Sequence, residues 1–164
     1  MTPITPCLWF DDNLEEAMEF YVKIFPNSSI GSISHYGEGG PGEPGKVMAG
    51  DWTLNGQAFR GINGGPAFAN FSEAISFSVD CQDQSEVDYY WDNLVAGGEP
   101  SQCAWLKDRF GLSWQIVPSR LNELMSDPNP ARAQAAVQAM LGMQKIVIAD
   151  LEAAADAAAP ASPA

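Results

Sequence analysis

The chain has little positive charge and almost no histidine, and both shortages limit what it can bind. Its 164 residues carry 8 Lys+Arg against 21 Asp+Glu, a formal charge of -13 at pH 7, and one histidine, His35. Such an acidic surface repels phosphate backbones and anionic membranes, so we expect no nucleic-acid and no membrane partner. One histidine cannot build the nitrogen-rich site of catalytic zinc or iron, although an oxygen-rich magnesium or manganese site needs none.

Long apolar runs and paired cysteines are missing too. No stretch approaches the roughly 18 residues of a membrane span, and no charged-then-apolar leader precedes a cleavage site. Cys7, Cys81 and Cys103 are odd in number and far apart in apolar or strand-like segments, which favours small buried thiols over disulfides. We therefore expect a cytoplasmic protein. Its 46% hydrophobic content suits one compact domain or two small modules sharing a core.

The first half of the chain has the order strand, helix and three strands. Asp12 and Glu15 form a possible capping box for a helix that ends near Phe25, because Pro26 follows. Asn55-Gly56 is a strong signal for a two-residue hairpin between the last two strands. The expected strands are Ile4–Phe10, Ile30–Tyr36, Lys46–Leu54 and Gln57–Ile62.

The second half repeats this order. Asp83 and Glu86 form a second capping box, and the helix after it has the same apolar spacing as the first, displaced by 70 residues. The expected strands are Ala74–Asp80, Ser101–Cys103, Trp105–Lys107 and Leu112–Val117, the last entered by a hairpin at Asp108–Gly111. The predicted fold class is therefore α+β, with two βαβββ modules.

The rest of the chain is predicted to be helical. Leu121, Leu124 and Met125 indicate a short helix, and Ala131–Met143 a longer one with Val137, Met140 and Leu141 on one stripe. Ile146–Ile148 is either a short strand or a linker, and Leu151–Ala159 is helical before a frayed tail. The expected divisions are 1–68, 69–118 and 119–164, within one structural domain.

Several segments resemble a known family. The repeated βαβββ unit resembles the vicinal oxygen chelate superfamily of glyoxalase I, extradiol dioxygenases and the bleomycin resistance protein. PCLWFDDNLEEAMEFY, ISFSVDCQDQSEVDYYWDNL, QCAWLKDRFGLSWQIVP and AMLGMQKIVIADLEAA are similar to its PhnB-like group, often labelled a 3-demethylubiquinone-9 3-methyltransferase domain, over Pro3–Ala154. The resemblance implies half-barrels that curl around a ligand cavity, and a homodimer.

The resemblance also implies where a metal would bind, with one ligand from the first and last strand of each module. These positions hold Pro6, Arg60 or Gly61, Ala74 and Gln115, none of them a good metal ligand, so we expect no metal and no cofactor. The methyltransferase label is not matched by a cofactor motif either, because Asp11-Asp12-Asn13 follows the first strand where a glycine-rich turn would be needed.

Strand alternation predicts a cavity for a small molecule with an anionic or carbonyl group. Arg60 would anchor the anion; alternatively, Arg60 bridges a surface acid, and Ser76 and Ser78 pair with each other or with backbone. Trp9 and Trp114 are placed on the helix-facing side instead. The expected ligand-binding residues are Leu8, Phe10, Arg60, Ser76, Ser78, Ser113 and Gln115.

Two further segments contain residues that could take part in chemistry. His35 is either a general base, as a weak catalytic candidate, or an exposed strand residue. Gly40–Lys46 has the spacing of a P-loop, but Val47 replaces the magnesium-binding hydroxyl and a strand follows, which favours a mobile lid or a plain loop.

The leading hypothesis is a PhnB-like protein that binds a small organic molecule in a metal-free cavity, with or without catalysis. The alternatives are a metal-dependent lyase, isomerase or dioxygenase and a purely structural interaction protein. Methyltransferase activity is disfavoured.

Overall fold

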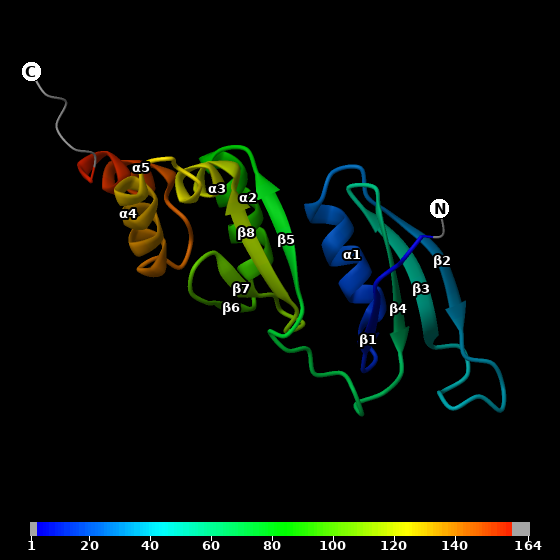
Figure 1. The fold of residues 1–164 in the computed structure, drawn as a ribbon. Coiled ribbons are helices and arrows are strands. Elements are labelled where there is room, and N and C mark those ends of the chain that lie inside the picture. Colours follow the sequence, from blue (N-terminus) through cyan, green and yellow to red (C-terminus); the bar gives the residue numbers. More distant parts are fainter. Residues whose placement is uncertain (1–2, 159–164) are drawn as a thin grey trace, which may run out of the picture. The chain divides into compact units, whose positions relative to one another are not determined.

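The structure, a computed structural model, describes residues 3–158 as two compact units that divide between Phe71 and Ser72 (Figure 1). Each unit is described by itself. The tail expected at 160–164, and Ala159 at the end of the last expected helix, lie outside the described residues.

The first unit is one sheet with one helix. Its four strands lie in the order β1-β4-β3-β2; β1 pairs in parallel with β4, and the other pairs are antiparallel. The elements are β1 (Cys7–Phe10), α1 (Leu14–Ile24), β2 (Ser29–His35), β3 (Val47–Leu54) and β4 (Gln57–Asn63).

The second unit repeats this plan. Its sheet order, β5-β8-β7-β6, places the strands in the same succession, with β5 parallel to β8. The elements are β5 (Ser76–Cys81), α2 (Gln84–Val95), β6 (Glu99–Pro100), β7 (Trp105–Lys107) and β8 (Ser113–Pro118). The prediction of an α+β fold made of two βαβββ modules is confirmed.

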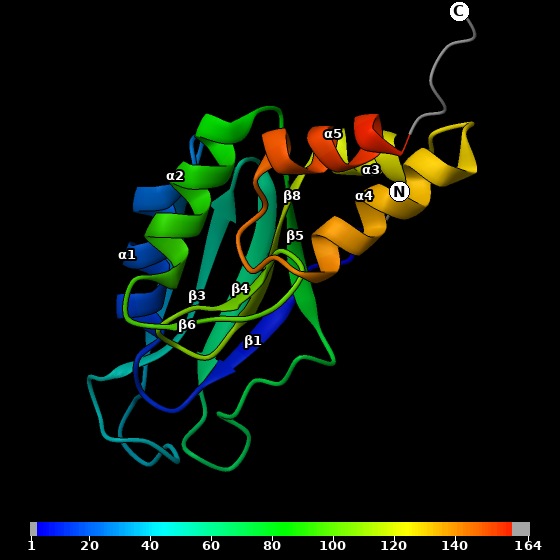
Figure 2. The same cartoon turned by 90° about the vertical axis from the view of Figure 1, so that its left-hand side faces the viewer.

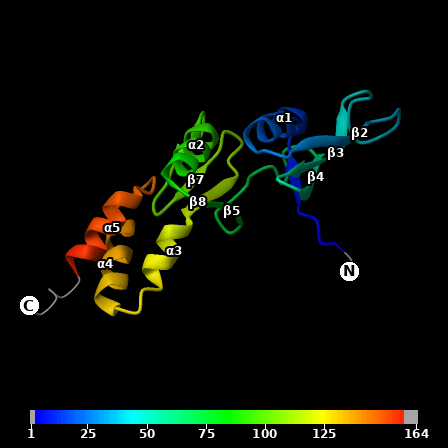
Figure 3. The same cartoon turned by 90° about the horizontal axis from the view of Figure 1, so that it is seen from above.

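Each module helix covers one face of its own sheet, as the view from above shows for α1 (Figure 3). The apolar stripe of α1 is buried, and glycines in the sheet admit it: a Cβ on Gly61 would come within 2.3 Å of Leu14, and one on Gly50 within 2.8 Å of Met18. On α2, Val87, Trp91 and Leu94 are the buried residues. The helices thus cover one side of each sheet; on the other side of the second sheet, Val117 packs against the C-terminal helices.

The two module helices begin differently. The Asp83 carboxylate accepts the Glu86 amide at 3.0 Å, which confirms Asp83 as the cap of α2, although Glu86 reaches back to the amide of Gln82. The predicted capping box at Asp12 and Glu15 is wrong. The first amide of α1, at Leu14, donates instead to the Asn63 side chain at the end of β4, at 3.0 Å.

The two hairpins also differ. Asn55 and Gly56 both have positive φ, 46° and 83°, as the tight hairpin required. The β7–β8 hairpin is built around the carboxylate of Asp108, which is 2% exposed and accepts hydrogen bonds from the amides of Phe110 and Leu112 and from the Trp114 indole. The sequence did not reveal that role.

The expected strand Ser101–Cys103 is wrong. Cys103 and Ala104 have φ of 56° and 74°, a left-handed backbone that cannot continue a strand. Their amides donate instead to the carbonyls of Met143 at 2.8 Å and Gln144 at 2.9 Å. The strand β6 lies earlier, at Glu99–Pro100.

Three helices follow β8 and lie side by side (Figure 2): α3 (Ser119–Met125), α4 (Pro130–Leu141) and α5 (Ile148–Ala157). Their shared core includes Leu121, Ala136 and Ile146, so residue 146 belongs to a buried linker rather than a strand. Leu141 is 52% exposed and so takes no part in this core; that its stripe packs on a partner stays a prediction. No helix within residues 3–158 is long and apolar enough to cross a bilayer.

The three thiols have different surroundings. Cys81 is buried as expected, and burial raises its pKa to about 12. Cys7 is exposed and Cys103 half-buried, so the expectation of buried thiols holds for Cys81 alone; all three are free.

Candidate functional site

Each sheet has an open face, defined here as the face turned away from its module helix. On the first sheet the open face carries Asp51, Arg60 and Ile62. Asp51 and Arg60 are paired across β3 and β4, so their side chains lie on the same side of the sheet. On the second sheet it carries Ser76, Ser113 and Gln115. Any ligand that contacts a sheet directly must use these faces or the ends of the strands.

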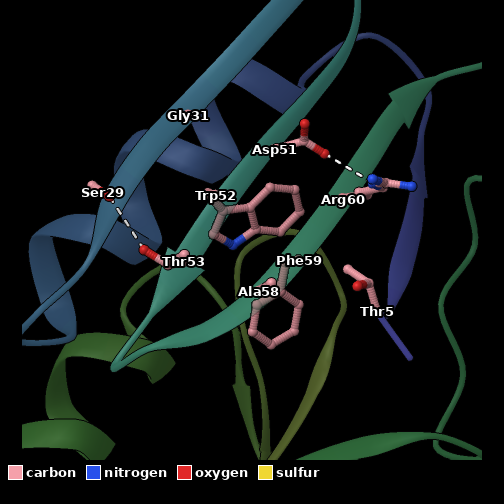
Figure 4. A pocket seen from close by; sticks show the side chains of 9 residues that line it. All are labelled: Thr5, Ser29, Gly31, Asp51, Trp52, Thr53, Ala58, Phe59 and Arg60. Atoms are coloured by element: carbon pink, nitrogen blue, oxygen red, sulfur yellow. Dashed lines mark hydrogen bonds and ion pairs between the residues drawn. The ribbon is translucent and has the colours of Figure 1, made fainter. Parts of the chain in front are cut away.

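Arg60 is already engaged on the open face of the first sheet. Its Nε lies 3.1 Å from Asp51 Oδ1, across β3 and β4, and the Ser32 hydroxyl donates to the other Asp51 oxygen at 2.7 Å. Asp51 and Arg60 line a hollow of about 180 Å³. Figure 4 shows this pair and, further along the strands, the hydrogen-bonded hydroxyls of Ser29 and Thr53. The geometry matches the alternative interpretation, in which Arg60 bridges a surface acid.

Leu8 and Phe10 do not share a face with Arg60, so that part of the predicted wall is wrong. The register pairs Leu8 with Gly61 and Phe10 with Asn63, one position away from Arg60 on β4. Because side chains alternate along a strand, both residues point toward α1, where they are 9% and 2% exposed. Trp9 takes the open face instead, contrary to the prediction.

The predicted residues of the second module lie on one face. Ser76, Ser78, Ser113 and Gln115 all lie opposite the buried Trp114, as the alternation indicated. Gln115 Nε2 donates to the Ser76 hydroxyl at 2.9 Å, so Ser76 pairs with Gln115 rather than with Ser78. The Ser113 hydroxyl is buried without a hydrogen-bond partner among the described residues. A role for the four in binding stays a prediction.

A large hollow lies at the end of the first sheet, and the sequence did not predict it. It has a volume of about 840 Å³ and is bounded by the loop between β2 and β3, the loop after β1 and the loop after β4. Its lining includes Trp9, Asp11, Asp12, Glu15, His35, Tyr36, Glu43, Lys46, Val47, Met48, Ala49, Ile62, Asn63, Gly64 and Gly65. We call this the end cavity. His35 lies in its wall.

Hydrogen bonds hold the walls of the end cavity in place. The Trp9 indole donates to the Gly65 carbonyl at 2.8 Å, and a Cβ on Gly64 would come within 2.1 Å of the Trp9 ring. Opposite, the Tyr36 hydroxyl donates to the Asn63 carbonyl. The cavity is thus preformed by contacts between residues far apart in sequence. The two glycine-rich loops are visible in the sequence, but no local pattern indicates that they lie beside the same cavity.

The residues at the superfamily's metal positions do not fit a divalent ion. Pro6 and Ala74 offer no donor side chain, Arg60 is a cation bound to Asp51, and the Gln115 amide binds Ser76. Within residues 3–158 no three or more His, Cys, Asp or Glu side chains converge in a way that could hold a metal.

Comparison with known proteins agrees with the fold. The family model described as 3-demethylubiquinone-9 3-methyltransferase matches residues 2–117, a shorter range than the expected Pro3–Ala154. The PhnB protein from Bacillus cereus is 36% identical, with a TM-score of 0.66 over 72% of this chain and 100% of that one. Helices α3 to α5 thus lie beyond the family model.

More distant solved structures share the fold alone. Protein PA1353 from Pseudomonas aeruginosa is 20% identical, with a TM-score of 0.60 over 72% of this chain and 98% of that one. The fosfomycin resistance protein FosX from Listeria monocytogenes is 17% identical, with a TM-score of 0.54 over 74% and 94%. No curated protein matches the chain. The chain belongs to the 3-demethylubiquinone-9 3-methyltransferase-like (PhnB) family and has the glyoxalase-like fold.

Proposed function

We propose that this protein binds a small organic molecule in the end cavity of its first module. The observation that carries the proposal is the cavity itself: about 840 Å³, with indole, phenol and aliphatic walls beside a few polar groups. Cavities of roughly 300–1,000 Å³ with this kind of lining are typical of small-molecule sites. Whether binding is coupled to a reaction is left open.

Native mass spectrometry of freshly purified protein tests the proposal. The expected result is a small organic molecule retained in the spectrum and lost on denaturation. The same spectrum reports the number of subunits, which we propose to be two from the family resemblance. A protein that retains no molecule and takes up none from a panel of metabolites at millimolar concentration would contradict the proposed function.

We further propose that binding uses no metal. The strand positions argue for this, since Pro6 and Ala74 offer no ligand atom, Arg60 carries the wrong charge and the Gln115 amide binds Ser76. The competing hypothesis is a metal-dependent lyase, isomerase or dioxygenase; one solved FosX structure is a complex with Mn(II) and sulfate ion. Elemental analysis of protein purified without chelators separates the two, and a stoichiometric divalent metal would support the enzyme.

Methyl transfer is disfavoured despite the family's description. The segment after β1, Asp11 to Asn13, leads into α1 without a glycine, whereas a Rossmann-like cofactor site depends on a glycine-rich turn there. Tight binding of S-adenosylmethionine in calorimetry would overturn this view.

The open faces remain a second candidate for the site. Arg60→Ala and Gln115→Ala separate the two: both leave affinity unchanged if the molecule sits in the end cavity, and both weaken it if the molecule contacts the sheets. Because Arg60 is exposed and neutralised by Asp51, we expect no change.

A further inference from the structure

The charges around the end cavity are strongly one-sided. Four carboxylates line it, from Asp11, Asp12, Glu15 and Glu43, against one lysine, Lys46. Lys46 is bound to Glu43 at 2.8 Å, so this cation and one of the anions neutralise each other. The remaining lining therefore carries a net negative charge beside its apolar walls.

The three other carboxylates have no partner at hydrogen-bond or ion-pair distance, although Lys46 lies close enough to interact electrostatically with Asp12. Asp11, Asp12 and Glu15 form no side-chain hydrogen bond or ion pair with any residue between 3 and 158. Acids near a helix start often serve as caps, but the first amide of α1 is already taken by Asn63, and no side chain at Asn13 caps the helix. Helix capping therefore does not account for them. All three side chains are exposed, so solvent screens their mutual repulsion, but their shared negative charge still favours a cation beside the hollow.

The rest of the lining suits the body of an organic cation rather than a bare ion. Trp9 and Tyr36 contribute aromatic surface, which attracts positively charged nitrogen groups, although each ring also packs against a loop glycine, Gly64 or Gly42; Ile62 and Ala49 add aliphatic surface. No three or more His, Cys, Asp or Glu side chains converge among the described residues, so a metal ion held by several such side chains is not favoured here.

We propose that the end cavity selects organic cations: molecules with an ammonium or similar positively charged nitrogen on an aromatic or aliphatic body. This inference rests on the proposed function and gives its ligand class. The proposed ligand is a cation, whereas Arg60 led us to expect an anion. Arg60 lies outside the cavity lining and is neutralised by Asp51. The cationic group meets Asp12 and Glu15, and the body lies along Trp9.

The experiment uses three probes of similar shape and different charge: 2-phenylethylammonium, 2-phenylethanol and phenylacetate. Affinities for the full chain are measured by calorimetry at low and moderate salt. The cation is expected to bind about tenfold more tightly than the alcohol, with phenylacetate weakest, and its advantage to shrink as salt rises.

Charge variants locate the effect. Asp12→Asn combined with Glu15→Gln is expected to weaken 2-phenylethylammonium about tenfold and leave 2-phenylethanol unchanged. The matched control is Glu19→Gln, an exposed acid further along α1 that is paired with Lys23 at 3.4 Å and does not line the cavity. It is expected to change neither affinity.

The outcomes separate the two proposals. Equal or tighter binding of the alcohol or phenylacetate overturns the cation preference while the binding function stands. If the double variant still prefers the cation, the inference is also overturned, because residues other than Asp12 and Glu15 would then recognise the positive charge. If none of the three binds and native mass spectrometry finds no retained molecule, both proposals fail.

Discussion

The two modules have one topology but start their helices by different means. In the second, Asp83 caps α2 from the position directly before it. In the first, Asn63 reaches the Leu14 amide from the end of β4, 49 residues away in sequence. A local sequence pattern therefore suffices to predict one helix start and misleads for the other. The difference matters for function, because the residue that caps α1 also lines the end cavity.

A second difference lies in the connection between the second and third strands of each module. There the connection between the second and third strands, His35 to Val47, is long and bounds the cavity. In the second module the corresponding connection is the short turn at Cys103 and Ala104, whose amides are bound by the segment at Met143 and Gln144. The long loop between β2 and β3 thus helps to form the cavity of the first module, whereas the segment at Met143 and Gln144 covers the short turn of the second.

The largest expected effect is at the second module's hairpin. Asp108→Ala leaves two backbone amides and the Trp114 indole without their acceptor in a buried site, which should cost about 3 kcal/mol of unfolding free energy. Urea unfolding measures it. Asp51→Ala, which removes an exposed carboxylate from the first module, is the control and should cost about 0.5 kcal/mol or less. Similar losses in both variants would show that Asp108 does not organise the hairpin.

The next effect is at the first module's helix start. Asn63→Ala removes the cap of α1 and the bond from Nδ2 to the Val47 carbonyl, a loss of about 2 kcal/mol. Asp83→Ala should cost less, because water replaces the exposed cap. Asn63→Asp keeps an acceptor for Leu14 and is expected to recover part of the loss. Equal stability of Asn63→Ala and the parent protein would contradict the long-range cap.

The smallest expected effect is a difference between the two helix caps in their response to low pH. The Ser85 hydroxyl, and then the Glu86 amide, hold the pKa of Asp83 below its ordinary value. A carboxyl with a lowered folded pKa stabilises the fold above its unfolded pKa, and this stabilisation is lost as pH falls through the folded value. Asn63 does not titrate. In an NMR titration from about pH 5 to pH 2, the Glu86 amide should shift more than the Leu14 amide, which senses only neighbouring carboxylates and not its cap; shifts of equal size would show that the caps are alike.

The sequence predicted both modules because their signals are local. Capping residues, 3-4-7 apolar spacing and alternating strands such as Ser76–Cys81 all lie within one element. The orientation of β1 was not predictable, because Cys7 to Phe10 is apolar at every position and alternation then gives no preferred face. The end cavity was missed because long-range hydrogen bonds join its walls: Trp9 donates to Gly65, and Tyr36 donates to Asn63.

The most direct test of the central claim is an NMR titration of the full chain with 2-phenylethylammonium. If the first module's end cavity is the site, the indole signal of Trp9 and the amides from His35 to Lys46 shift and saturate together, while those of Ser76 and Gln115 stay in place. Shifts confined to the second module, or spread evenly over the acidic surface, would contradict it.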